Sequence, residues 1–262
     1  MDQNKAAYYA ALDGDLRGVE VALAQGADVN ALIQRAGPAA DVNGRDTLLV
    51  ISVEDDHYDV ARFLLEHGAN PNLADDDDIF PLLTAKTARV IDLLVAHGAD
   101  VNRQNGDYGE TPLMIQVSRA NIESLRALLR HGASLSFRNH DDETALTMAQ
   151  SFHEHARLAP VGAGAVVKRW KEGMEPIINL LQAVEAAGSY KRYLREPVVQ
   201  LLALRYLSLA GRASAPANLL RLFGAPPVRN AGKARTRARS AASTPLPDEV
   251  FKLVLGFWNE RV

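Results

Sequence analysis

The phrase HGADVN at residues 97–102 indicates a repeated structural unit, because related copies of it occur elsewhere in the chain. The other copies are QGADVN at 25–30, HGANPN at 67–72 and HGASLS at 131–136. Their glycines are 42, 30 and 34 residues apart, and a weaker copy, EAAGS, places Gly188 another 56 residues along the chain. This spacing indicates one structural unit of roughly 33 residues, repeated with insertions.

Each copy of the phrase follows a predicted helix. In VARFLLEHG, IDLLVAHG and LRALLRHG the apolar residues recur at helical spacing and stop at a glycine, which adopts the left-handed cap conformation at low cost. Thr and Pro then begin the next helix, as in TPLM from Thr111, since Thr caps backbone amides and Pro suits the first turn. One helix pair cannot cover its own apolar faces, so neighbouring repeats are expected to bury Leu64, Leu65, Leu93, Leu94, Leu128 and Leu129.

Two segments show the repeat most completely: ETPLMIQVSRANIESLRALLRHGAS at 110–134 and DTLLVISVEDDHYDVARFLLEHGAN at 46–70. They resemble the repeats of the ankyrin family, in which a β-turn precedes two antiparallel helices. The resemblance implies an all-α, ankyrin-repeat solenoid of about five helix pairs, joined by β-turn fingers. It predicts one array over residues 1–190, in which the third repeat, FPLL from Phe80, is three residues short.

Two insertions interrupt the predicted array. About nine extra residues in ALIQRAGPAADVNG lengthen the finger before the second full repeat. About 23 more, residues 151–173, separate the two helices of the last repeat. A loop of that length is either a tolerated surface insertion or a functional element. Its KRWKEG segment, with Trp170, is expected to add helix packing on the stack.

Three segments follow the array. Residues 191–224 have helical periodicity and are predicted to cap its open end. Residues 225–245 contain five basic residues and no acidic one, among Pro, Gly, Ala and Ser, which predicts a basic flexible linker. Residues 246–262 are predicted to form a final amphipathic helix.

The final helix, LPDEVFKLVLGFW, resembles the opening helix of an F-box, the module that binds the Skp1-type adaptor of a ubiquitin ligase. The resemblance implies an adaptor that recruits substrates to the ligase. A helix that folds back to cap the array would show the same pattern, and the sequence leaves both readings open. The adaptor-binding residues in the first reading are Leu246, Pro247, Val250, Phe251, Val254, Leu255 and Trp258.

Residue types and spacings argue against catalysis. The chain has no cysteine, which excludes disulfides, thiolate metal ligands and a cysteine nucleophile. Its glycines fit neither a dinucleotide loop nor a phosphate loop, and its histidines lack the spacing of a zinc hydrolase. We therefore predict a non-enzymatic protein with no catalytic residue, cofactor or metal. The absence of a secretory signal or apolar span predicts an intracellular protein, cytoplasmic or nuclear, with no membrane partner.

Charge is divided unevenly along the chain. Residues 1–148 hold 24 acidic and 12 basic residues, a net charge of −12, whereas residues 149–262 hold 8 and 17, a net charge of +9. The ankyrin resemblance implies that finger tips and first helices form a concave binding face, and these positions are acidic. Aligned carboxylates predict a partner protein with a basic segment and disfavour nucleic acid on this face. The predicted partner-binding residues are Asp46, Glu54, Asp55, Asp75, Asp76, Asp77, Asp78, Asp107, Tyr108, Glu110, Phe137, Asp141, Asp142 and Glu143.

Overall fold

The computed structural model describes residues 2–34, 44–160 and 164–195. The chain divides into two compact units, Met1–Ala186 and Ala187–Val262. In the second unit, residues 190–195 are helical. The predicted linker at 225–245 and the predicted final helix at 246–262 lie outside the described residues, as does most of the predicted cap at 191–224.

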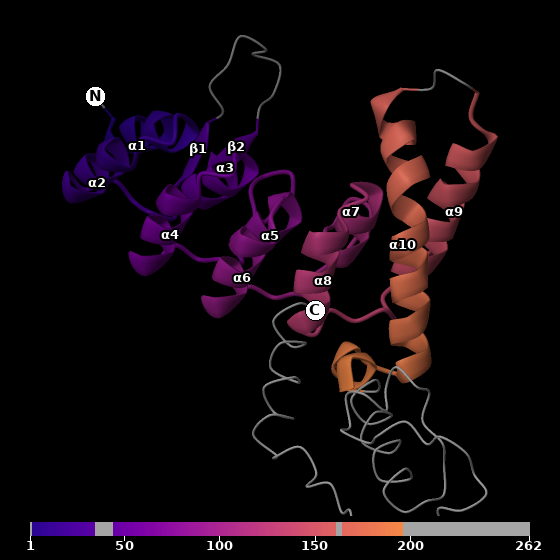
Figure 1. Ribbon diagram of the computed structural model, residues 1–262. Coiled ribbons are helices and arrows are strands. Elements are labelled where there is room, and N and C mark those ends of the chain that lie inside the picture. Colours follow the sequence, from indigo (N-terminus) through magenta and orange to yellow (C-terminus); the bar gives the residue numbers. More distant parts are fainter. Residues whose placement is uncertain (1, 35–43, 161–163, 196–262) are drawn as a thin grey trace, which may run out of the picture. The chain divides into compact units, whose positions relative to one another are not determined.

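The first unit is a stack of helix pairs, as the sequence predicted (Figure 1). The first helices contact one another in order, namely α1 (Gln3–Leu12), α3 (Leu48–Glu54), α5 (Pro81–Thr84), α7 (Pro112–Ser118) and α9 (Ala145–Leu158). The second helices form the other layer, namely α2 (Leu16–Ala24), α4 (Tyr58–Glu66), α6 (Ala88–Ala96) and α8 (Ile122–Arg130). Helix α10 (Ala165–Ala187) completes the last pair.

Helix boundaries fall where the sequence predicted them. The hydroxyl of Thr47 accepts a hydrogen bond from the backbone N–H of Val50 at 3.1 Å, and Thr111 accepts one from Met114 at 3.4 Å. At the other end, the glycine of each phrase has a left-handed φ of 89° to 94°: Gly26, Gly68, Gly98 and Gly132. Residues with a Cβ are strained there, which explains why the chain reuses glycine at this point.

Adjacent pairs bury their apolar side chains against each other. Each of the six leucines expected in the core is at most 9% exposed. Phe80, Ile91 and Met114, from the third and fourth pairs, are buried as completely. Burying one such side chain contributes about 1.5–3 kcal/mol relative to leaving it in water. Because the covering atoms come from the neighbouring pair, the pairs stabilise one another.

The first insertion extends a finger as a two-stranded ribbon. Strand β1 (Leu32–Gln34) pairs antiparallel with β2 (Arg45–Thr47), and Ile33 lies opposite Asp46. Ile33 is only 6% exposed, so the base of the ribbon packs on the array. Residues 35–43, between the strands, lie outside the described residues.

Three asparagines, Asn30, Asn72 and Asn102, join successive fingers, and we call them the asparagine ladder. The amide oxygen of Asn72 accepts from the backbone N–H of Asp100 at 2.8 Å, and its Nδ2 donates to the carbonyl of Gly98 at 2.9 Å. Asn30 makes the same two bonds to the next finger at 2.8 and 3.1 Å, and Asn102 at 2.8 and 3.4 Å. The last residue of the repeated phrase therefore connects one repeat to the next.

The third pair is short, and side chains of the fourth pair donate hydrogen bonds to its backbone carbonyls. Helix α5 has four residues, so the carbonyls that follow its end lack a further helical turn to bond them. Arg119 Nη1 donates to the carbonyls of Thr84 and Ala85 at 3.3 and 3.0 Å, and Gln116 Nε2 donates to that of Ala85 at 2.9 Å. The carbonyl of Lys86 accepts at 2.8 and 3.0 Å from two further side chains of the fourth pair, Asn121 and Ser124.

The second insertion is helical at residues 151–158 and 165–173. Its ends lengthen both helices of the last pair, so that α9 has 14 residues and α10 has 23. Trp170 stacks on Phe152 with 4.5 Å between ring centroids, and its Nε1 donates to the carbonyl of Ser118 at 2.8 Å. The expected packing of the KRWKEG segment on the array is therefore confirmed.

Candidate protein-binding surface

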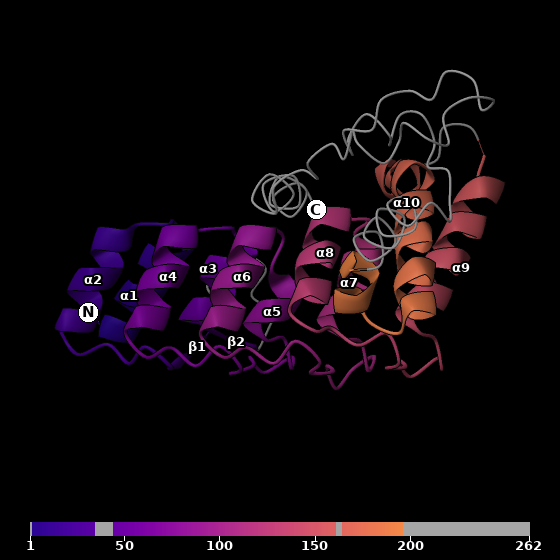
Figure 2. The same ribbon diagram turned by 60° about the horizontal axis from the view of Figure 1, so that its bottom comes forward.

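The fingers follow one another along one edge of the stacked helices (Figure 2). Backbone hydrogen bonds connect their tips: the N–H of Asp76 donates to the carbonyl of Arg45 at 3.2 Å, and that of His140 donates to Tyr108 at 2.8 Å. The predicted residues in 75–78, 107–110 and 141–143 thus lie on one continuous edge.

The four-aspartate run is bonded within the chain. Asp75 is 7% exposed, and its carboxylate accepts from two backbone N–H groups of the same turn at 2.9 and 2.8 Å. Asp76 accepts from Arg45 Nε and Nη2 at 3.0 and 3.1 Å. Asp78 accepts from Arg103 Nη2 at 2.7 Å. Asp76 and Asp78 therefore hold adjacent fingers together, a role that the charge pattern alone does not show because both arginines are distant in sequence.

Several predicted residues lie away from the finger tips. Asp46 is 8% exposed and accepts a hydrogen bond from the hydroxyl of Tyr8 at 3.4 Å. Glu54 and Asp55 end helix α3, which begins at the finger and is seven residues long, so they lie about 10 Å further along its axis. Phe137 is half-buried in the last finger. The structure therefore does not bring Asp46, Glu54 and Asp55 to the tips.

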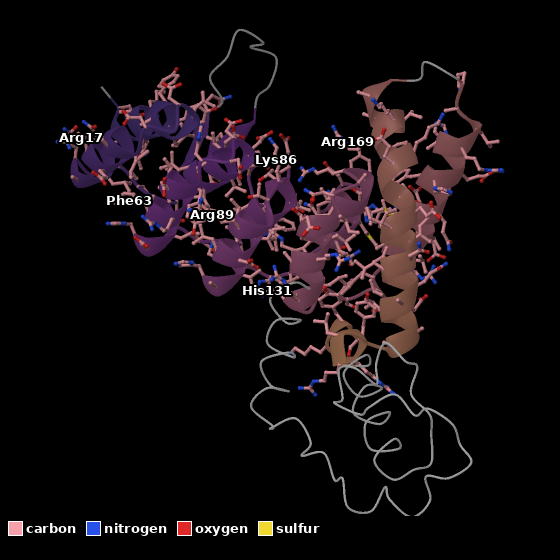
Figure 3. All side chains as sticks on the ribbon, viewed as in Figure 1. Arg17, Phe63, Lys86, Arg89, His131 and Arg169 are labelled. Carbon is pink, nitrogen blue, oxygen red and sulfur yellow. The ribbon has the colours of Figure 1, made fainter. Side chains whose placement is uncertain are left out.

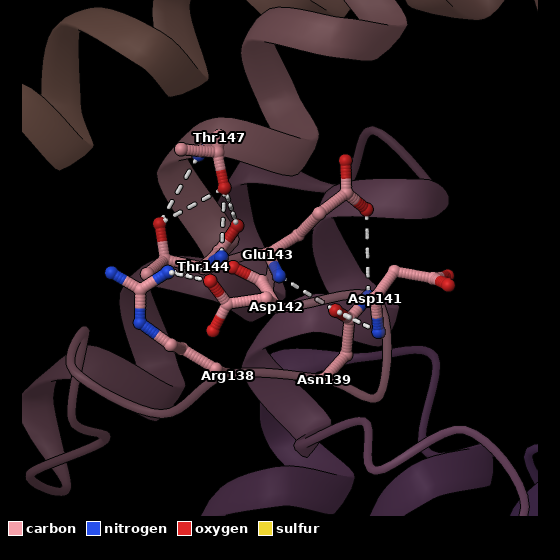
Figure 4. Close-up of polar contacts among 7 residues, drawn as sticks. All are labelled: Arg138, Asn139, Asp141, Asp142, Glu143, Thr144 and Thr147. Atoms are coloured by element: carbon pink, nitrogen blue, oxygen red, sulfur yellow. Dashed lines mark hydrogen bonds and ion pairs between the residues drawn. The ribbon is translucent and has the colours of Figure 1, made fainter.

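A hydrogen-bonded turn fixes the tip of the last finger (Figure 4). The amide oxygen of Asn139 accepts from the backbone N–H groups of Asp141 and Glu143 at 3.1 and 2.8 Å. Arg138 Nη1 pairs with the carboxylate of Asp142 at 3.2 Å. The carboxylates of Asp141 and Glu143 lie on the side of the turn away from the Arg138 guanidinium (Figure 4).

Among the predicted residues at the finger tips, four carboxylates without an arginine partner and one aromatic ring remain. We call them the acidic finger patch: Asp107, Tyr108, Glu110, Asp141 and Glu143. Within the described part of the chain, none of these carboxylates forms an ion pair. Burial raises the pKa of Glu110, and the carboxylates of Glu143 and Asp141 raise it further. Tyr108 is 65% exposed beside them. The patch is therefore a surface of unpaired negative charge beside an exposed aromatic ring.

Two family models match the chain: residues 44–76 match the model of a single ankyrin repeat, and residues 82–159 match the model described as ankyrin repeats (3 copies). The chain contains ankyrin repeats. The matched ranges coincide with the stacked pairs from α3 to α9, so the ankyrin array is the interaction fold that the sequence predicted. Ankyrin repeats form a non-enzymatic, protein-binding fold, and the fingers belong to the surface that such a fold presents.

Relatives of the ankyrin array occur in different organisms. An ankyrin repeat protein of fowlpox virus is 30% identical over 110 residues, which is 40% of this chain and 32% of the relative. The ankyrin repeat protein nuc-2 of Neurospora crassa is 25% identical over 193 residues, 66% of this chain and 18% of the relative. The nuclear factor NF-kappa-B p105 subunit of Gallus gallus is 28% identical over 174 residues, which is 64% of this chain and 17% of the relative. The chain spans less than a third of each relative.

The remaining sites considered in the sequence are those for a metal ion, a membrane and an adaptor. Among residues 2–34, 44–160 and 164–195, no three His, Asp or Glu side chains come together to hold a metal ion. No helix in these ranges is both long and apolar enough to cross a membrane. The expected adaptor-binding residues lie outside the described residues: Leu246, Pro247, Val250, Phe251, Val254, Leu255 and Trp258.

Proposed function

We propose that the ankyrin array binds a basic segment of a partner protein at the acidic finger patch. The main support is Glu110, a half-buried carboxyl in the electrostatic field of Glu143 and Asp141 with no ion-pair partner among the described residues. A Lys or Arg of the partner would offset this repulsion and donate charge-assisted hydrogen bonds. The patch is thus better suited to a bound cation than to solvent alone.

Tyr108 adds apolar contact area to the patch. Its side chain is 65% exposed, while its backbone carbonyl is fixed by the N–H of His140 at 2.8 Å. A rigid backbone with an exposed ring suits an interface, because aromatic side chains provide much of the binding energy. The ring face also attracts an ammonium or guanidinium group.

Calorimetric titration of the full chain with an Arg- and Lys-rich peptide tests this function. The affinity should fall as salt is added, because ions screen exposed charges over about 8–10 Å. Tyr108→Ala should weaken binding by about 1 kcal/mol or more, and Asp141→Asn should weaken it through the lost charge. Glu20→Gln is the matched control, since it removes the same charge from an exposed position on α2. Equal losses in the two charge variants, or an unchanged Tyr108→Ala, would contradict the proposal.

The sequence supports a second candidate, a substrate-recruiting adaptor of a ubiquitin ligase. Its support is the stretch LPDEVFKLVLGFW at 246–258, which resembles the start of an F-box. Deletion of residues 245–262 tests it against the alternative of a cap. Lost capture of a Skp1-type protein by a still-folded array would support the adaptor, whereas lost stability with no capture by the full chain would favour the cap.

A further inference from the structure

A basic pocket lies at the end of the helices opposite to the fingers. It is lined by Lys86 between α5 and α6, by residues 119–122 between α7 and α8, and by Arg169 of α10. Its volume of about 510 Å³ is within the usual range of about 300–1,000 Å³ for small-ligand sites. Figure 3 labels Lys86 and Arg169, which extend from different elements on this side of the array. None of the lining residues belongs to the acidic finger patch.

The second insertion supplies one wall of the pocket. The indole N–H of Trp170 bonds the carbonyl of Ser118 at 2.8 Å, immediately before Arg119. Gly173 lies so close to the same connection that a Cβ there would be 3.0 Å from the Cβ of Ala120. These two contacts hold α10 against the α7–α8 connection. They place Arg169, the residue before Trp170, at the pocket.

The three cationic side chains have hydrogen-bond donors left for a ligand. Arg119 uses Nη1 for the carbonyls of α5, which leaves Nε and Nη2 of a group with five N–H donors. Lys86 donates to the backbone carbonyl of Glu54, which leaves part of its ammonium group. Arg169 is exposed, and within the described residues it forms no ion pair or side-chain hydrogen bond.

The local charge favours an anion. Helix α8 begins at the pocket, where Asn121 caps the N–H of Ser124 at 3.1 Å, and the helix N-terminus adds a partial positive charge. None of the described residues that line the pocket is an Asp or Glu. The acids around it are Glu54, which acts on Arg119, Asp56, which accepts from the Thr87 hydroxyl at 3.0 Å, Glu123 in the first turn of α8, and Glu172, three residues after Arg169 on α10. The lining itself therefore carries three positive charges and no negative one, which favours an anion.

We propose that the Lys86–Arg119–Arg169 pocket binds a phosphate group, carried by a free small phosphate or by a phosphorylated side chain. Phosphate oxygens point in several directions and match donors that come from three separate elements. Guanidinium groups bind phosphate through two parallel hydrogen bonds. A carboxylate carries one charge and would leave more of the pocket's positive charge unneutralised.

Titration calorimetry of the full chain with sodium pyrophosphate at constant ionic strength tests the pocket. Arg169→Ala should weaken binding about tenfold, through loss of charge-assisted hydrogen bonds. Lys168→Ala is the matched control, because this exposed neighbour on α10 has the same charge and does not line the pocket. It should change the affinity less than about twofold, as expected for a screened surface charge. The circular dichroism spectrum of Arg169→Ala should match that of the wild type.

Two results would overturn the proposal: an unchanged affinity in Arg169→Ala, or equal losses in the two variants. A phosphoserine peptide and its unphosphorylated form distinguish the sources of the phosphate. Tighter binding of the phosphopeptide than of pyrophosphate would assign the site to a phosphorylated partner, and the reverse to a free phosphate. Equal binding of the two peptides, without binding of pyrophosphate, would also refute phosphate recognition.

Discussion

Replacing Asn72 with alanine tests the asparagine ladder directly. The substitution removes an acceptor 2.8 Å from the N–H of Asp100 and a donor 2.9 Å from the carbonyl of Gly98. A hydrogen bond contributes about 0.5–1.5 kcal/mol net, and water reaches both groups in the variant. We therefore expect Asn72→Ala to lower the free energy of unfolding by about 1–2 kcal/mol, which is towards the lower end of the summed contribution of the two hydrogen bonds. Urea unfolding of the full chain, followed by circular dichroism, measures this change.

Two related variants separate the hydrogen bonds from a general effect of substitution. In Asn72→Asp the acceptor stays, but a carboxylate replaces the donor beside the Gly98 carbonyl, so the loss should be greatest at neutral pH. The loss of stability should shrink below about pH 4, because the protonated carboxyl then donates a hydrogen bond again. Asn102→Ala should cost less, since its donor bond is 3.4 Å long. If Asn72→Ala changed the free energy of unfolding by less than about 0.5 kcal/mol, as a substitution at any exposed position does, the two hydrogen bonds would not stabilise the array as argued.

Three further variants test the cap, the short repeat and the patch. Gly98→Ala should lower stability by about 1 kcal/mol through backbone strain at φ 92°, because nothing lies within 4 Å of the added Cβ; an unchanged urea midpoint would contradict this. Arg119→Met should cost about 1–3 kcal/mol, since the α5 carbonyls lose a donor, and thermal unfolding would show it. Glu110→Gln should raise stability at pH 7 by at most about 0.5 kcal/mol, because the folded state raises the pKa of this carboxyl and its ionisation opposes folding. That gain should disappear as the pH falls below the raised pKa, where the wild-type carboxyl is protonated; a gain independent of pH would refute the charge argument.

Local chemistry made much of the fold predictable. The cap at Gly98 and the N-terminal Thr111 act within a few residues of their own helix, and the leucines recur at helical spacing. Such features need no knowledge of distant partners. The asparagine ladder left only one trace in the sequence, an asparagine at the same place in three copies of the phrase. Its meaning depends on how adjacent repeats stack, which spacing alone does not give.

The candidate surface was less predictable, for the same reason. The acidic finger tips were visible as a charge pattern, yet Asp76 and Asp78 are bonded to Arg45 and Arg103, each more than twenty residues away. The insertion also had two readings in the sequence. The contact of Trp170 with the carbonyl of Ser118, in a different repeat, could not be identified from the insertion alone.

The short third repeat limits how this chain can be rearranged. Because α5 ends after four residues, the carbonyls of residues 84–86, at and after its end, rely on donors from Gln116, Arg119, Asn121 and Ser124 in the repeat that follows. A protein engineer could therefore not move this unit to another place in the stack, or truncate the chain just after it, without also moving its successor. The two repeats are in effect one module of double length, and a deletion that divides them should lower the stability of the array.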